Sequence, residues 1–114
     1  MNCYAIWVDL SPGVGDLEFA NALAAYLGHL KSLGLIEGSR VMRRKLGFGP
    51  AELGEWFIQI ETRDLAQLDS AFNEAAARQG ESELLHSEVF RRVRNFRSGL
   101  YRDFPDAVRK GGNA

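Results

Sequence analysis

The stretch that decides the fold lies near the amino terminus and reads Cys3-Tyr4-Ala5-Ile6-Trp7-Val8-Asp9-Leu10. Apolar side chains recur at every second position, and successive side chains of an extended chain point to opposite faces. The even-numbered residues therefore form one apolar face, while the odd-numbered residues, among them Trp7 and Asp9, form the other. We predict a half-buried β-strand over residues 3–10.

Three more strands are expected, over residues 40–48, 53–62 and 95–104, and the loop at 49–54 is short enough for an antiparallel hairpin. The strand at 53–62 places Trp56, Ile58 and Ile60 on one face, which marks them as core. Its other face carries a mixed set of side chains: Glu55, Phe57, Gln59 and Glu61.

Helical spacing and end signals predict three helices between these strands. Asp16 is a candidate N-cap of the first helix, whose apolar residues recur at three- and four-residue spacing as far as Gly34. Asp64 opens the second helix, with a glutamine three positions on as in a capping box, and Gly80 closes it. The third helix is expected over residues 81–92, with acidic residues at its start and arginines at its end.

The resulting order β-α-β-β-α-(α)-β is the split-βαβ, ferredoxin-like pattern of an α+β protein. It predicts a four-stranded antiparallel sheet with the helices on one face, in a single domain over residues 1–114 with a frayed tail at 109–114. The uncovered face would then display Trp7 and Phe57 beside carboxylates. Because an exposed aromatic patch of this kind marks an interface, we expect a homodimer through this face.

Composition narrows the classes of partner. Lys and Arg total 14 against 15 Asp and Glu, so the basic excess that favours nucleic-acid binding is absent. The single cysteine, Cys3, excludes an internal disulfide, and the chain shows neither a basic leader nor an apolar run long enough to span a bilayer. We expect a cytoplasmic protein that binds neither nucleic acid nor membrane.

The two histidines, His29 and His86, fall on expected helices and lack the spacing of a metal site. For His29 and His86 alike, an ordinary hydrogen bond is favoured over a role in ligating a haem. We therefore expect no metal and no cofactor.

Candidate site residues follow from the uncovered face. Asp9 and Glu61 are the candidates for general acid or base, the alternative for the acidic residues being pairing with Arg43 or Lys45. The candidate ligand-binding residues combine aromatic walls with polar or cationic anchors: Trp7, Phe57, Gln59, Arg43 and Tyr101. Tyr26 is a further aromatic residue that could line a pocket.

Four stretches carry a resemblance to a known family: Tyr26-Leu27-Gly28-His29-Leu30, Arg43-Arg44-Lys45-Leu46-Gly47-Phe48-Gly49-Pro50, Leu65-Ala66-Gln67-Leu68-Asp69-Ser70-Ala71-Phe72 and Leu100-Tyr101-Arg102-Asp103-Phe104-Pro105-Asp106. On them the chain resembles a family of uncharacterised bacterial proteins, a domain of unknown function among the dimeric α/β barrels. The resemblance implies a fold and a dimer but no reaction. The wider superfamily includes cofactor-free monooxygenases, haem-degrading enzymes and stress-responsive proteins.

Two functions remain open at this point. One is a small-molecule site inside the barrel for an apolar or aromatic ligand, with cofactor-independent, monooxygenase-like chemistry. The alternative is a non-catalytic interaction or stress-related protein whose sheet face serves only to dimerise. A cavity of ligand size, on the order of 300 Å³, would favour the first.

Overall fold

The computed structural model describes residues 1–105, so the tail expected at 109–114 lies outside the described residues. Seven elements follow one another along the chain: β1 (Asn2–Leu10), α1 (Asp16–Ser32), β2 (Gly38–Arg43), β3 (Trp56–Thr62), α2 (Leu65–Ala76), α3 (Gly80–Phe90) and β4 (Val93–Arg102). The expected order of strands and helices is confirmed.

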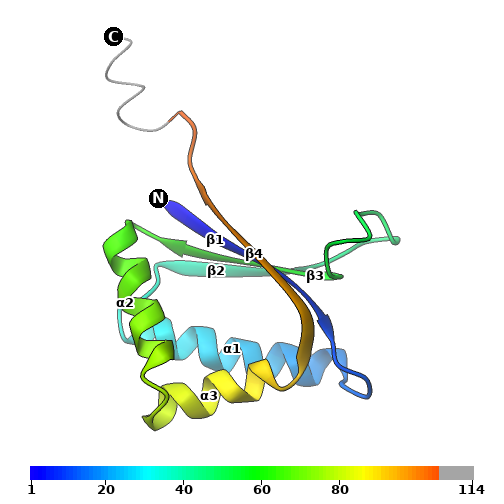
Figure 1. Cartoon of the computed structure of the whole chain (residues 1–114), viewed down its shortest axis with the longest axis horizontal. Coiled ribbons are helices and arrows are strands. Elements are labelled where there is room, and N and C mark those ends of the chain that lie inside the picture. The colour runs from blue at the N-terminus through cyan, green and yellow to red at the C-terminus, as the bar shows by residue number, and fades with distance from the viewer. Residues whose placement is uncertain (106–114) are drawn as a thin grey trace.

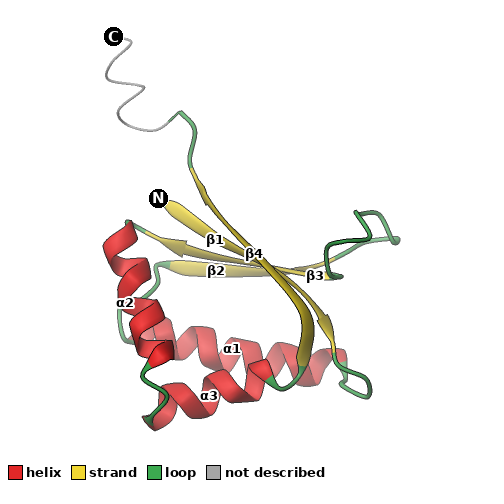
Figure 2. Ribbon diagram, viewed as in Figure 1, coloured by secondary structure: helices red, strands yellow, loops and turns green. Residues whose placement is uncertain are grey.

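The strands form one sheet in the order β2-β3-β1-β4, and every neighbouring pair is antiparallel. β3 lies between β1 and β2, so the crossover through α1 is a split βαβ unit, and the fold is the expected ferredoxin-like α+β fold. Within the described chain the sheet is open, with β2 and β4 as its edges (Figure 2). The barrel expected from the resemblance would therefore require a second copy.

All three helices lie on one side of the sheet, and α1 and α3 run side by side (Figure 1). The core fills the space between the two layers and is built around Phe19 of α1, which is fully buried. Its ring meets the edge of the Trp56 ring at 5.1 Å between centroids. Ile58 and Ile60 are buried beside Trp56, so the predicted core face of this strand is confirmed.

The ends of the helices agree with the sequence in part. Asp64 caps α2 by accepting a hydrogen bond from the Gln67 backbone at 2.9 Å, as expected. The N-cap of α1, however, is Gly15, and Asp16 is the first residue of the helix, where its carboxylate forms an ion pair with an arginine of β2. α2 already ends at Ala76, and Gly80, with φ +72°, begins α3 instead of closing α2.

The strand expected at 40–48 is shorter than predicted, because β2 ends at Arg43 and residues 44–55 form a loop. The backbone turns at Leu46 and Gly47, which have φ of 57° and 72°. The Arg44 guanidinium stabilises the loop by donating hydrogen bonds to the carbonyls of Pro50 and Leu53 at 2.9 and 2.7 Å. These side-chain bonds replace the ladder bonds that a longer hairpin would have made.

Candidate functional site

The uncovered face of the sheet carries a row of side chains that crosses all four strands. The register pairs Phe57 with both Met42 and Trp7, and Trp7 with Arg97 on β4. The rings of Trp7 and Phe57 stack at 4.9 Å between centroids and within 6° of parallel. Both are half-buried in the single chain and lie on the face opposite the helices, as the alternation predicted.

The next two rows of this face hold other residues expected at the site. Gln59 lies one row from Phe57, opposite Ala5, and Glu61 lies one row further, opposite Cys3. Cys3 is in turn opposite Tyr101 on β4. Four of the five expected ligand-binding residues therefore share one surface.

Arg43 does not join them, although it borders a cavity on this face. In the register it is opposite Trp56, and its guanidinium lies 5.0 Å from the centroid of the Trp56 ring, on the helical side. It is hydrogen-bonded to the carboxylates of Glu55 and Asp16. The expected alternative, in which a carboxylate pairs with Arg43, is confirmed for Glu55.

The two candidate acids differ in environment. The carboxylate of Asp9 accepts hydrogen bonds from the Asn95 amide and the Glu55 backbone, both at 3.0 Å, and these two bonds lower its pKa. Asp9 thus connects the ends of three strands. Glu61 is exposed, and its charge, after the larger effect of burial, raises the pKa of the Cys3 thiol.

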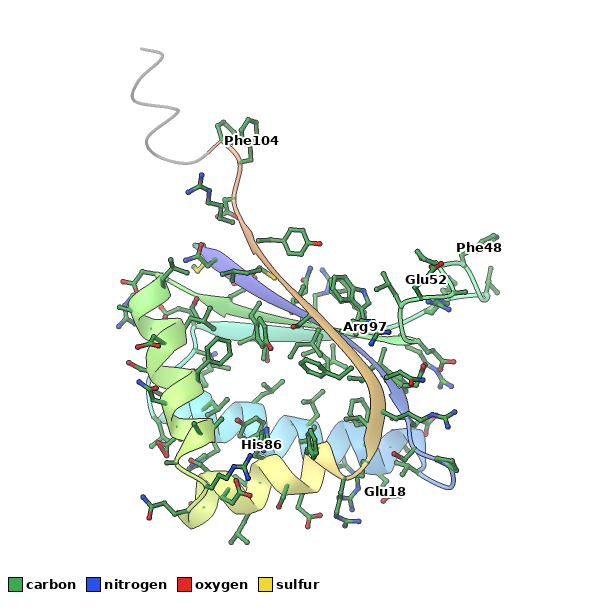
Figure 3. All side chains as sticks on the ribbon, in the orientation of Figure 1. Glu18, Phe48, Glu52, His86, Arg97 and Phe104 are labelled. Carbon is green, nitrogen blue, oxygen red and sulfur yellow. The ribbon has the colours of Figure 1, made fainter. Side chains whose placement is uncertain are left out.

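A second candidate site lies on the helical side of the sheet, in three neighbouring cavities that share His86. They measure about 100, 210 and 410 Å³. The first two also share Ile6, Tyr26 and Phe96, while the last two share Phe72. We call these three cavities together the helix-side cleft. Figure 3 shows His86 on α3, below the sheet.

Two polar groups stand in the largely apolar inner part of this cleft. The His86 ring contacts the rings of Tyr26 at 5.4 Å and Phe90 at 5.9 Å. Neither the His86 imidazole nor the Tyr26 hydroxyl makes a hydrogen bond within residues 1–105. Burial, followed by the charges of Glu74 and Glu83, raises the pKa of Tyr26, so its phenol remains a neutral hydrogen-bond donor.

The mouth of the helix-side cleft is apolar and open. Phe72 is 45% exposed, and Phe90 is 66% exposed. Phe96 and Leu100 of β4 are about half exposed on the same side of the sheet. Large apolar side chains left open around a cavity are typical of a ligand-binding groove.

The sequence did not predict this cleft, because its even-numbered strand residues were taken to pack fully beneath the helices. The covering is incomplete: Tyr4 and Ile6 are only partly buried. One signal was present, since His86 and Phe90 are four residues apart and so lie on the same side of a helix. The apolar pattern of this helix predicts a buried stripe at Leu85, Val89 and Val93, and it does not include His86 or Phe90.

His29 takes part in a chain of contacts that links the helices. Its Nε2 lies 2.8 Å from the Ser82 hydroxyl, which donates to the Glu74 carboxylate at 2.9 Å. This chain of contacts joins all three helices and holds α3 in place beside α1. The ordinary hydrogen bond expected for His29 is confirmed, whereas the one expected for His86 is wrong within residues 1–105.

Within residues 1–105, no three His, Cys, Asp or Glu side chains gather closely enough to hold a metal ion. Among the helices of this same range, none combines the length and the apolar character needed to cross a bilayer.

The fold and the two surfaces define the class of protein: a ferredoxin-like α+β domain with one uncovered sheet face and an apolar cleft beneath the other. The chain belongs to the family of unknown function DUF6614, whose model matches residues 1–114. No curated protein matches the sequence.

Several solved structures share the fold. An Arabidopsis thaliana protein, At3g17210, is similar at a TM-score of 0.72 and 6% identity, over 94% of this chain and 99% of that one. A dimeric ferredoxin-like protein of unknown function from Jannaschia sp. CCS1 has a TM-score of 0.64 and 15% identity, over 90% and 98%. SnoaB, a cofactor-independent oxygenase from Streptomyces nogalater, has a TM-score of 0.60 and 11% identity, over 93% of this chain and 95% of that one.

Proposed function

We propose that this protein binds a small, largely apolar or aromatic molecule with one polar group in the helix-side cleft. The observation that carries the proposal is the position of His86, which lines all three cavities and has no hydrogen-bond partner within the described chain. The nitrogens of His86 are not among the buried unpartnered atoms of residues 1–105, so they are accessible to a hydrogen-bonding group of a bound molecule. A ligand with a hydroxyl or carbonyl group would supply that partner.

The charges around the cleft restrict the ligand further. Glu83 lines the outer cavity, and both Glu74 and Glu83 act on the Tyr26 hydroxyl. Because both carboxylates, after the larger effect of burial, raise the pKa of Tyr26, they also disfavour an anionic ligand beside it. Arg78 also borders the outer cavity, but it does not line the two inner ones. The ligand of the inner cleft is therefore neutral, with its polar group near His86 and Tyr26.

We further propose that the protein is a homodimer through the uncovered sheet face. The stacked Trp7 and Phe57 rings are a large apolar surface on that face, and a second copy would bury them. The ferredoxin-like protein from Jannaschia sp. CCS1 is described as dimeric, which supports a dimer of this fold. Two facing sheets would make the α/β barrel, with Gln59, Glu61 and Tyr101 as the polar groups between them.

The chemistry that we propose for the helix-side cleft is proton transfer by His86, because its ring lines all three cavities within reach of a bound molecule. The cofactor-independent oxygenase among the similar structures supports such chemistry by fold alone. Asp9 is the weaker candidate for this work, since its two hydrogen bonds hold it as a carboxylate between strands. An open cleft of ligand size favours this function over the alternative, a non-catalytic interaction protein.

Calorimetry with 1-naphthol tests the binding proposal. This probe is an apolar aromatic with one hydroxyl group. We expect wild-type protein to bind it and the Ala75→Phe variant to lose at least about 90% of the affinity, because Ala75 borders two of the three cavities. Ala66→Phe is the matched control, since Ala66 is exposed on the same helix and lines none of these cavities.

Equal affinities in the wild type and both variants would refute the assignment of the helix-side cleft. An absence of binding to the wild type would favour the non-catalytic alternative.

A further inference from the structure

A separate cavity of about 210 Å³ lies on the uncovered face, where the loop 44–55 meets the sheet. We call it the loop pocket. Its sheet side is formed by Trp7, Phe57 and Met42, and its loop side includes Phe48 and Pro50. Figure 3 shows Phe48 at the outer end of this loop, which projects beyond the sheet. The loop pocket and the helix-side cleft therefore lie on opposite faces.

Arg44 gives the loop pocket a positive charge. Its Nη2 donates to the carbonyls of Pro50 and Leu53, whereas its Nε and Nη1 make no hydrogen bond within residues 1–105. No carboxylate of this range forms an ion pair with Arg44, and the Arg44 charge is among the smaller causes that lower the pKa of Asp9. Glu55 also lines the pocket, but its carboxylate is paired with Arg43.

The two features of the pocket suit one kind of ligand. Aromatic rings that line a pocket offer apolar edges and faces against which another planar ring can pack. A guanidinium group with free N–H groups binds a carboxylate through charge-assisted hydrogen bonds. The volume is also adequate, because an apolar cavity of roughly 150 Å³ holds a benzene molecule.

We infer that the loop pocket is a binding site for a small aromatic carboxylate, with its ring against Trp7 and Phe57 and its carboxylate on Arg44. This inference does not depend on the ligand proposed for the helix-side cleft, but it uses Trp7 and Phe57, which also belong to the proposed dimer interface. The helix-side cleft disfavours anions, whereas the loop pocket requires one. The sequence predicts an anchor at Arg43. Because β2 ends at that residue, we assign this anchor to the next residue, Arg44.

Benzoate is the probe that tests this inference, with benzamide as its neutral counterpart. The readout is the indole N–H resonance of Trp7 in NMR spectra, distinguished from that of Trp56 by the Trp7→Phe variant. We expect millimolar benzoate to shift the Trp7 resonance and leave that of buried Trp56 in place. Benzamide should bind at least about tenfold more weakly, and added salt should weaken benzoate binding.

Arg44→Gln should abolish the benzoate effect. Arg40→Gln is the matched control, since it removes the same charge from the same sheet face, opposite Gln59, and away from the pocket. Because Arg44 also supports the loop, the comparison of benzoate with benzamide on the wild-type protein stands without any variant. Equal binding of the two probes, an unshifted Trp7 resonance, or equal loss in both variants would overturn the inference.

Discussion

Replacing Trp7 with arginine is expected to convert the proposed homodimer to a monomer while leaving the fold of each chain intact. Trp7 is half-buried on the uncovered face, outside the core cluster between the sheet and the helices. Its partner across the strands β1 and β4 is Arg97. A new arginine would therefore place two like charges side by side in the proposed interface, where charges without partners are costly.

We expect the dissociation constant of the Trp7→Arg dimer to rise by at least about a thousandfold, or about 4 kcal/mol. Sedimentation velocity measures the mass, and circular dichroism checks the fold. Leu17→Arg is the control, because Leu17 is 74% exposed on α1, on the other side of the molecule from this face. A Trp7→Arg protein that keeps the mass of a dimer would place the interface elsewhere.

The second large effect is expected at Gly54, in the loop two residues before β3. A Cβ atom added there would lie 2.3 Å from the backbone carbon and oxygen of Val8, and neither atom can move without shifting β1. Gly54→Ala should therefore reduce the free energy of unfolding by more than about 2 kcal/mol. This close approach also brings the Glu55 backbone to the carboxylate of Asp9.

Gly28 provides the matched comparison, since it lies in α1 and a Cβ there would meet nothing within 4 Å. Gly28→Ala should raise the free energy of unfolding by about 0.5–1 kcal/mol, because alanine favours a helix over glycine. Urea denaturation of both variants measures the two changes. Unfolding free energies within about 0.5 kcal/mol of wild type for Gly54→Ala would contradict the close packing of β1 on the loop.

The strand faces were predictable because the period of two is a strong signal when large residues carry it. Trp56 and Ile58 fell beneath the helices, and Trp7 and Phe57 fell on the opposite face. The cap at Asp64 was predictable for a similar reason, since it depends on contacts three residues apart. Such features depend on local sequence alone.

The end of β2 and the residues that meet at the two sites depend on contacts between segments far apart in the chain. The alternation of apolar and polar residues carries no information about such contacts. The strand stops at Arg43 because Arg44 binds carbonyls up to nine residues further along the chain. Asp9 becomes a structural carboxylate through Asn95, 86 residues away. The helix-side cleft forms where α3 leaves the sheet partly uncovered, and this spacing between layers has no signature in the sequence.

Binding of a neutral aromatic molecule at His86 can be observed by NMR of the two imidazole rings. His29 is an internal reference, because its Nε2 already contacts Ser82. Titration with 1-naphthol should shift the ring resonances of His86, leave those of His29 unchanged, and have no such effect in Ala75→Phe. Resonances of His86 that stay constant, with 1-naphthol either unbound or perturbing only the uncovered sheet face, would contradict the account.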